Sequence, residues 1–435
     1  MKKVILISFV LILMFFCYAN SEETGDDQLL EILLKNGTIT KDQYDNLKKK
    51  SEEKLKEDTE DFDFRISSKG GIEIEKNDGS FSCKFGGRIL LDASFYDEDK
   101  NALGDGTEIR QARFDTEGTL FTDWEYSLAL EFGNAEIDIK DAIIAYKGFA
   151  PLSIKAGHFK TPFSLEQMNS RKFLTFTERA LPNEFAPDRK IGVGANIYGD
   201  IWTAEAAFLG EFFSDDPDDE ADEGWTAASR FTLSPIHSDN TIVHIGTSGL
   251  YQIPDDDKEV KFDAKPETHI MSVKYVNTGK IKNIENLFKY GFEAAFLYGP
   301  FSVQGEYIGC YLNRDDNEED LDFTGWYIFS SYFLTGESRN YKFKKGAFGR
   351  VKPVHKFGAI ELALRYSTID LNDEPNITGG EEKNVTLGLN WYINPNIRLI
   401  TNYIFVDNDK YANDSGDVLE EDDINIFQVR FQVEF

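Results

Sequence analysis

Six cationic side chains lie between residues 160 and 190, in a stretch that contains only four anionic ones. The cations are Lys160, Arg171, Lys172, Arg179, Arg189 and Lys190, and the anions are Glu166, Glu178, Glu184 and Asp188. The stretch is therefore net positive, whereas the whole chain of 435 residues has a net charge of −30. A net positive segment of this length is unusual in so acidic a chain, which makes it a candidate for function.

The same stretch lacks the regular pattern of its neighbours. Apolar and polar residues alternate on either side, but residues 160–190 show no such alternation. A long connection of this kind inside a compact fold is usually functional or disordered. Its apolar side chains would anchor a folded loop, and they are Pro162, Phe163, Leu165, Phe173, Leu174 and Phe176.

From about Phe62 to the C-terminus, short segments alternate strictly between apolar and polar residues. Clear examples are RILLDASFY (88–96), EYSLALEF (125–132), AIELALRYS (359–367) and NVTLGLNWY (384–392). This period of two predicts β-strands with one apolar and one polar face. Both a soluble sandwich and a transmembrane barrel with a water-filled lumen satisfy the pattern.

Three features favour the transmembrane barrel. Aromatic residues lie at segment ends, as expected for girdles at the membrane interface, and they are Trp124, Tyr146, Trp202, Trp225, Trp326, Trp391 and Tyr392. Long acidic connections alternate with short turns such as YGPF (298–301) and INPN (393–396). The chain ends in IFQVRFQVEF, an amphipathic strand that closes on Phe435. About 370 residues, at about 23 per strand and connection, predict an all-β barrel of about sixteen strands with an aqueous channel.

The N-terminus predicts export. Lysines and an apolar run up to Cys17 are typical of a signal peptide, which we expect to cover residues 1–19 with cleavage after Ala19. A lipoprotein signal that uses Cys17 is the alternative. No other apolar run approaches the about 18 residues of a membrane-spanning helix.

The expected mature chain has two parts. Residues 20–61 predict a periplasmic helical or coiled-coil segment and a charged linker, and Thr40 and Gln43 have the spacing of a capping box. This segment is either a spacer or an element for oligomerisation or contact with the cell wall. Residues 62–435 predict the barrel, which we expect in the cell outer membrane.

Several other functional classes find no support in the sequence. The acidity argues against nucleic acid as a partner, because nucleic-acid binding needs a basic face. Gly-x-Ser-x-Gly and His-Glu-x-x-His motifs are absent and the five histidines are scattered, so we expect no enzyme, metal site or cofactor. The acidic runs lack the spacing of an EF-hand calcium loop. Cys83 and Cys310 are too few for a disulfide framework and are expected to be packed residues.

Eight blocks of sequence, in a specific order and spacing, span nearly all of the expected mature chain. They are FGGRILLDASFY (85–96), RQARFDTEGTLFTDWEYSLALEF (110–132), IKDAIIAYKGF (139–149), LSIKAGHFKTPFSLEQMNSRKFLTFTERALP (152–182), YFLTGESRNYKF (332–343), FGRVKP (348–353), AIELALRYSTIDL (359–371) and LGLNWYINPNIRL (387–399). Together they resemble the phosphate-selective porins O and P. The resemblance implies a sixteen-stranded barrel in outer-membrane lipid, usually a homotrimer, with a third loop folded into the lumen as a constriction. Residues 160–190 are similar to that loop.

Within this loop, Arg179 and Lys172 match cationic positions of the family, so the resemblance assigns both as anion contacts. Lys160, Arg171 and Arg189 complete the expected cationic constriction. For Arg179, the alternative is an ion pair with Glu178 or Glu184 that only holds the loop.

The chain also departs from the family at three positions. Phosphate-selective members carry a further lysine where this chain has Gln167, an acidic wall residue where it has Lys140, and a tyrosine where it has Lys160. These departures put phosphate specificity in doubt, although the charge is redistributed rather than removed.

The parity of the strands predicts further cations on the lumen wall. They are Arg88, Arg113, Lys155, Arg230, Lys274, Arg365 and Arg430, with Lys140 as the family's wall position. Inward acidic residues such as Glu131 and Glu306 oppose them. We therefore expect passive diffusion of small anionic solutes, such as phosphate or polyphosphate. The alternatives are a general or cation-preferring porin and a structural barrel that tethers the layers of the envelope.

Overall fold

The computed structural model describes residues 30, 32–60, 62–67, 71–133, 136–210, 223–238, 240–315, 318–412 and 421–435. The expected signal peptide, residues 1–19, lies outside the described residues, as do most of the acidic runs at 214–224 and 413–423. No helix in the described part of the chain is long and apolar enough to cross a membrane.

Two compact units make up the chain, and each is described by itself. The first comprises the residues up to Phe64 together with Ile74–Asp78, and the second comprises Arg65–Glu73 and Gly79–Phe435. Two short strands, β1 (Phe62–Ser67) and β2 (Gly71–Lys76), lie in the region where the two units alternate along the chain.

In the first unit, residues 32–35 are helical. Gly37 lies just after them, and its φ of 68° lets the chain leave the helix. Helix α3 (Lys41–Glu60) follows. The predicted capping box is confirmed, because the Thr40 backbone N–H donates to Gln43 Oε1 at 2.9 Å and the Gln43 N–H donates to Thr40 Oγ1 at 3.3 Å. Two of the backbone donors at the start of this helix are therefore satisfied locally.

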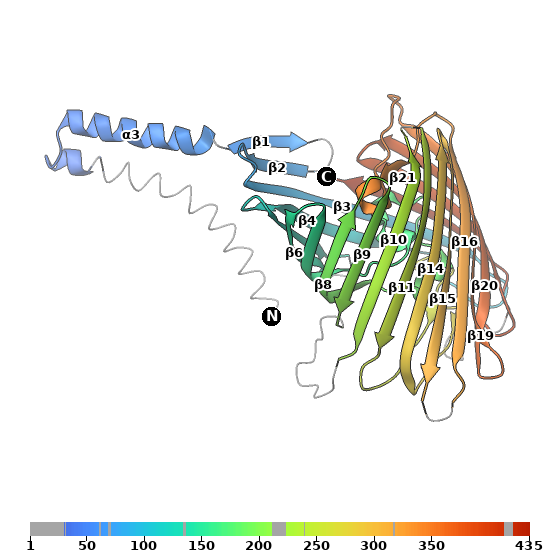
Figure 1. Cartoon of the computed structure of the whole chain (residues 1–435). Helices are drawn as coiled ribbons and strands as arrows, with labels where there is room; N and C mark the ends of the chain where they lie inside the picture. The colour runs from blue at the N-terminus through green and yellow to red at the C-terminus, as the bar shows by residue number, and fades with distance from the viewer. Residues whose placement is uncertain are drawn as a thin grey trace. The chain divides into compact units, whose positions relative to one another are not determined.

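The second unit is a closed barrel of sixteen antiparallel strands (Figure 1). The strands are β3 (Phe81–Asp97), β4 (Gly106–Leu120), β5 (Trp124–Glu131), β6 (Asp138–Phe149), β7 (Leu152–Lys160), β8 (Arg189–Tyr198), β9 (Trp202–Leu209), β10 (Trp225–His237), β11 (Thr241–Ile253), β14 (Ile284–Tyr298), β15 (Phe301–Arg314), β16 (Leu321–Phe333), β19 (Ala359–Asp373), β20 (Ile377–Asn394), β21 (Ile397–Asn408) and β22 (Ile424–Glu434). Each pairs with the next, and β22 closes the barrel on β3 from Asn425↔Asp97 to Glu434↔Arg88. The predicted all-β barrel of about sixteen strands is confirmed.

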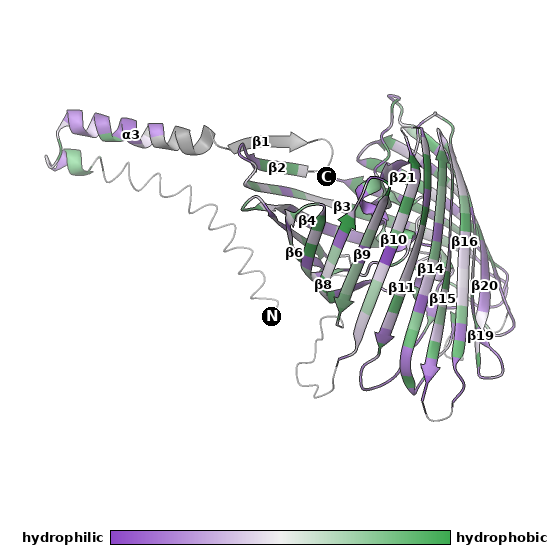
Figure 2. Ribbon diagram, viewed as in Figure 1, coloured by the Kyte–Doolittle hydropathy of each residue, from purple (hydrophilic) through white to green (hydrophobic). Residues whose placement is uncertain are grey.

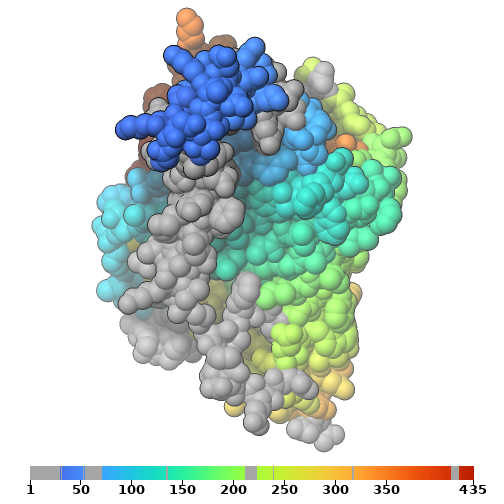
Figure 3. Space-filling view, turned by 90° about the vertical axis from the view of Figure 1, so that its left-hand side faces the viewer, coloured from blue at the N-terminus to red at the C-terminus, as the bar shows by residue number. Residues whose placement is uncertain are grey.

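Burial along the strands is the reverse of that in a soluble protein. On β20, Leu387 and Leu389 are 48% and 46% exposed, whereas Thr386 and Asn390 are fully buried. Figure 2 colours the same strands by hydropathy, and hydrophobic bands recur along β15 and β16 between hydrophilic or neutral ones. Figure 3 shows part of the continuous outer surface that the first barrel strands form. An apolar outer face and a polar inner face are what a barrel in lipid requires.

One predicted girdle residue is wrong. Trp391 is 42% exposed on the outer face, but Tyr392 is buried, and its hydroxyl donates to Glu361 Oε2 at 2.8 Å. Neighbouring residues of a strand point to opposite faces, so two adjacent aromatic residues cannot both lie on the outer surface. Cys83 and Cys310 are both buried and unpaired.

The two ends of the barrel differ in their connections. At one end, the turn end, the predicted turns YGPF (298–301) and INPN (393–396) are confirmed as two-residue connections at 299–300 and 395–396, and most other connections are similarly short. One connection at this end, residues 334–358, is long. At the opposite end, the loop end, the longest connections are residues 161–188 and 254–283.

These three long connections all contact side chains of the inner wall. We call residues 161–188 the inner loop, residues 254–283 the crossing loop and residues 334–358 the turn-end segment. The inner loop contains α4 (Leu165–Met168), η1 (Arg171–Phe173) and η2 (Leu181–Phe185), the crossing loop contains β12 (Asp263–Ala264) and β13 (Val276–Asn277), and the turn-end segment contains β17 (Asn340–Lys342), η3 (Phe343–Lys345) and β18 (Ala347–Gly349). The sequence analysis identified only the first as a lumenal element.

Candidate functional site

The inner loop crosses the lumen from β7 and β8 to the strands β20 to β22. Its apolar side chains anchor it, and Phe163, Leu165 and Phe176 are each at most 1% exposed. At the far wall, the Arg398 guanidinium donates to the carbonyls of Leu174 and Thr175 at 2.6 and 3.0 Å. Wall side chains therefore satisfy backbone groups that have no strand partner, as a buried loop requires.

Two predicted constriction residues lie at the base of this loop and share backbone partners. Lys160 Nζ donates to the carbonyls of Gln167 and Asn169 at 2.7 and 2.9 Å. Arg179 Nη2 donates to the same two carbonyls at 3.4 and 3.3 Å, and Arg179 Nε donates to that of Glu166 at 3.0 Å. A carbonyl oxygen carries only a partial charge, so neither cation is neutralised by a hydrogen-bonded carboxylate.

No ion pair with a carboxylate is found for Lys160 or Arg179 among the described residues. The expected alternative for Arg179, a pair with Glu178 or Glu184, is therefore not formed. Instead, both cations donate to carbonyls beside the helix α4, and the carboxylates of Glu166 and Asp188 act on Arg179 without direct contact.

The other three predicted constriction residues have acidic partners. Arg189 donates to both oxygens of Asp141, with Nε–Oδ1 at 2.9 Å and Nη2–Oδ2 at 3.1 Å. Lys172 Nζ lies 3.9 Å from Asp115 Oδ2. Arg171 pairs with Glu178. Each of the three therefore has a carboxylate in contact or close by, unlike Lys160 and Arg179.

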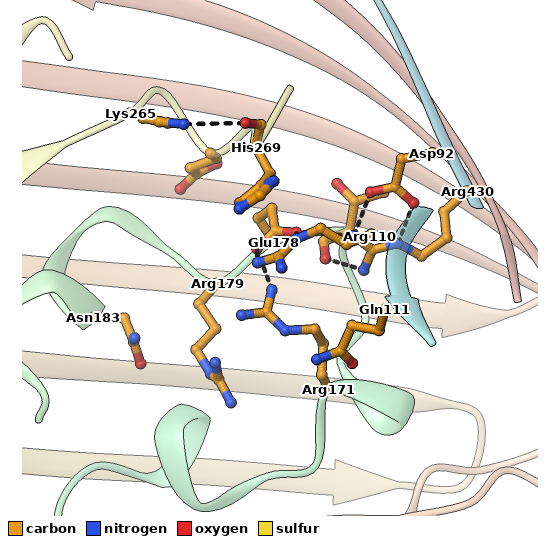
Figure 4. Close-up of polar contacts among 12 residues, drawn as sticks. Asp92, Arg110, Gln111, Arg171, Glu178, Arg179, Asn183, Lys265, His269 and Arg430 are labelled. Atoms are coloured by element: carbon orange, nitrogen blue, oxygen red, sulfur yellow. Dashed lines mark hydrogen bonds and ion pairs between the residues drawn. The ribbon is translucent and has the colours of Figure 1, made fainter. Parts of the chain in front are cut away.

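Glu178 is a meeting point of three arginines (Figure 4). Arg110 contacts its carboxylate through Nε at 2.8 Å and Nη2 at 3.2 Å, and Arg430 Nη2 contacts it at 2.8 Å. Arg171 is the third partner. Burial acts to raise the pKa of Glu178, but the charges of Arg110, Arg171 and Arg430 outweigh it and hold that pKa well below its usual range.

Sequence reasoning missed Arg110. Strict alternation along β4 places Gln111 and Arg113 on the inner wall, so Arg110 should point outward. The pairing of β3 with β4 shifts at this point, from Leu90↔Gln111 to Leu91↔Ile109, which leaves Arg110 as an extra residue. Such a bulge redirects a side chain, and no residue type in the local sequence marks it.

The predicted wall cations are found inside the barrel, mostly in pairs. Arg113 contacts Glu131 at 3.0 Å, Lys155 contacts Glu205 at 3.7 Å, Arg230 contacts Glu293 at 2.6 Å, Arg365 contacts Glu267, Lys140 contacts Asp138, and Arg88 Nε donates to Gln111 Oε1 at 2.8 Å. Lys274 is the exception. It lies in the crossing loop rather than on a strand and pairs with Asp263 at 2.6 Å, so its prediction as a wall residue is wrong.

The crossing loop was not expected inside the lumen. Its Glu267 is 4% exposed and accepts hydrogen bonds from Arg365, Ser367 and Thr386, on β19 and β20. Gln428 Nε2 on β22 donates to the Glu267 carbonyl at 3.0 Å. One residue therefore fixes the tip of this loop to three strands of the wall.

The turn-end segment reaches the inner loop from the opposite side. The Phe348 backbone N–H donates to Asn169 Oδ1 at 2.7 Å, and Arg230 Nη2 donates to the Gly346 carbonyl at 2.7 Å. Leu165 and Phe348 belong to one buried apolar cluster. The turn-end segment thus packs against the inner loop from the turn end of the barrel.

Comparison with known proteins agrees with this architecture. A family model described as phosphate-selective porin O and P matches residues 83–435. Porin O of Pseudomonas aeruginosa is 30% identical over 417 residues, which cover 87% of this chain and 94% of that protein.

Solved structures share the fold at low sequence identity. The anion-selective porin from Comamonas acidovorans aligns with a TM-score of 0.52 and 14% identity, over 82% of this chain and 100% of that one. The trimer form of OmpT, an outer membrane protein of Vibrio cholerae, aligns with a TM-score of 0.51 and 13% identity, over 82% and 100%. The matches to the family model and to Porin O lead to one conclusion: the chain belongs to the phosphate-selective porin O and P family and is an outer-membrane porin.

Proposed function

We propose that the protein lets small anionic solutes, such as phosphate or polyphosphate, diffuse passively through a constriction at the inner loop. The observation that carries this proposal is the shared position of Lys160 and Arg179, whose donors meet carbonyls rather than carboxylates. Two fixed positive charges in a narrow passage attract anions strongly, because little water lies between the charge and the ion.

The preference is proposed for small anions in general rather than for phosphate alone. Gln167 stands where phosphate-selective relatives carry a lysine, and its Nε2 donates to the Pro187 carbonyl and to Asp188 Oδ1, each at 3.2 Å. The inner loop therefore lacks one cation of the phosphate-selective pattern. Arg179 remains the group suited to an oxyanion, because its planar guanidinium offers several donors.

We further propose a homotrimer in the outer membrane, exported by a cleaved signal peptide. The solved trimer form of the OmpT protein supports this oligomeric state. The apolar outer faces of the strands are suited to contact with lipid and with neighbouring barrels.

The decisive experiment is the reversal potential of the purified protein in planar bilayers under a potassium chloride gradient. We expect the sign that corresponds to chloride being more permeant than potassium. The opposite sign would favour the cation-preferring porin that the net charge of −30 suggests. An absence of conductance would favour a barrel that only tethers the layers of the envelope.

A further inference from the structure

Arg110, Arg171 and Arg430 converge on one point of the lumen, although they come from β4, the inner loop and β22. We call them the three-arginine site. The group at their centre is the carboxylate of Glu178, which accepts hydrogen bonds from all three guanidinium groups. Three guanidinium groups around two oxygen atoms form the kind of donor set that binds phosphate and other oxyanions.

The charges at this position do not balance. Asp92 is the only other acidic partner of the three arginines among the described residues, and it binds Arg430 through both oxygens at 2.7 and 2.6 Å. Three positive charges therefore face two negative ones, which leaves one positive charge in excess. Arg430 is fully buried and is held by Asp92, by Glu178 and by the Thr177 carbonyl, so its guanidinium is fixed in place.

The site is not completely closed off from solvent. The side chains of Arg110, Arg171 and Glu178 are 14%, 17% and 13% exposed, in contrast to 0% for Arg430. Lys265 of the crossing loop is near enough for the charges of Arg110 and Glu178 to act on it, and its ammonium donates to the His269 carbonyl at 3.1 Å (Figure 4). Glu108 also acts on this ammonium and accepts a hydrogen bond from His269, so Lys265 adds no uncompensated charge to the site.

We propose that the three-arginine site is an oxyanion-binding site whose resident ligand is the Glu178 carboxylate, and that a phosphate-like dianion in the lumen displaces it. The proposal rests on the proposed function, because it requires anions to enter the lumen. Glu178 then acts as a tethered competitor and determines which anions bind.

The tether explains why the competition depends on valence. A ligand held on the same loop as Arg171 has a high effective concentration, so a free monoanion with one charge cannot replace it efficiently. A dianion brings a second charge to a position that already has one positive charge in excess. The site should therefore bind phosphate and exclude chloride.

The test replaces Glu178, the proposed competitor of phosphate. Glu178→Gln keeps the size of the side chain and removes its charge, and we expect the phosphate concentration that half-blocks chloride current to fall about ten-fold or more. Glu205→Gln is the matched control, because Glu205 is an inner-wall carboxylate that contacts Lys155 at 3.7 Å and pairs across the sheet with Arg230, and neither of these belongs to the three-arginine site. Equal effects of the two changes would reflect total lumen charge alone and would overturn the proposal.

A second variant covers the case in which Glu178→Gln does not assemble. Glu178→Asp retains the charge but shortens the side chain by one methylene, so its carboxylate cannot reach all three guanidinium groups at once. We expect a smaller fall of the half-blocking concentration in this variant. A block equal to that of the wild type would show that Glu178 only staples the loop, which would overturn the proposal.

A separate measurement distinguishes this inference from the proposed function. The purified variants are heated in detergent with inorganic phosphate, and the temperature of barrel unfolding is recorded. Phosphate should stabilise Glu178→Gln more than Glu205→Gln, whatever the sign of the wild-type reversal potential. Equal stabilisation in a protein that still prefers chloride to potassium would contradict the three-arginine site and leave the proposed function intact.

Discussion

The cations at the base of the inner loop and the arginines of the barrel wall are held in opposite ways. Lys160 and Arg179 donate to backbone carbonyls, whereas Arg230 and Arg365 each contact a buried carboxylate. A carbonyl accepts hydrogen bonds from a cation but does not neutralise its charge. A carboxylate does both. A basic residue on the inner wall is therefore not by itself a contribution to the electrostatic field of the pore.

This difference also resolves the conflict between the acidic chain and a cationic passage. Charges on exposed loops are screened beyond about 8 Å at physiological salt, so the net charge of the chain says little about the narrowest region. Paired cations of the wall add little there. The field that an ion meets should depend on the few cations without a carboxylate partner.

The largest effect is expected for Arg365→Ala, on stability. Arg365 is 1% exposed, pairs with Glu267 of the crossing loop and donates to the Glu178 carbonyl of the inner loop at 3.0 Å. Its loss leaves the Glu267 carboxylate buried without a cation, which costs about 3–5 kcal/mol. We expect a clear fall in the temperature at which the heat-modifiable band on gels is lost.

The control for this prediction is Arg88→Ala. Arg88 is similarly buried, but its hydrogen-bond partner is the neutral amide of Gln111, so no charge is left behind. Its unfolding temperature should fall less than that of Arg365→Ala. Equal losses would mean that Arg365 acts through packing on Phe176, whose ring lies 4.3 Å from the guanidinium carbon, rather than through its ion pair.

The next effect concerns selectivity rather than stability. Arg179→Ala removes an uncompensated charge, and a bound phosphate would lose a charge-assisted hydrogen bond worth roughly 1.5–3 kcal/mol. The half-blocking phosphate concentration should therefore rise about ten-fold or more. Arg230→Ala should change it less, because Glu293 was already neutralising this cation and His244 Nε2 remains 2.8 Å from that carboxylate.

The two variants are compared by reversal potential and phosphate block in the same bilayers. A larger loss of anion preference in Arg230→Ala than in Arg179→Ala would break the distinction between the two sets of cations. It would also place the permeation path along the wall rather than at the base of the inner loop.

The fold could be predicted from the sequence because a barrel strand repeats one simple rule. Each residue faces either lipid or lumen, so segments such as NVTLGLNWY show the two faces directly. The inner loop could be recognised in the sequence because it lacks this alternation and is net positive in an acidic chain. The crossing loop and the turn-end segment also interrupt the rule, but nothing local distinguishes a loop that folds inward from one that stays in solvent.

The candidate site was harder to predict, because charge compensation depends on contacts between distant residues. Glu267 meets Arg365, nearly one hundred positions away, and Glu178 meets Arg430 on the last strand. Arg110 reaches the site only through a bulge. The sequence could identify which residues are cationic, but the pairing that removes or preserves each charge is a property of the tertiary structure.

The smallest effect is expected for Gln167→Lys, which restores a cation that phosphate-selective relatives carry. The present Gln167 amide donates to Asp188 Oδ1 at 3.2 Å, so a lysine ammonium at this position would meet the same carboxylate. Gln167 is 2% exposed, but the Asp188 side chain is 51% exposed and already contacts Arg189, so a new pair with it should change binding energies by about 1 kcal/mol or less. The half-blocking phosphate concentration should therefore fall by less than about five-fold. The double variant Gln167→Lys with Asp188→Asn removes this carboxylate partner. Its fall in half-blocking phosphate concentration, expressed as a free energy, should exceed the sum of the effects of the two single variants. Additive effects would mean that pairing with a carboxylate does not silence a cation in this lumen, and the distinction between the loop base and the wall would fail at its first premise.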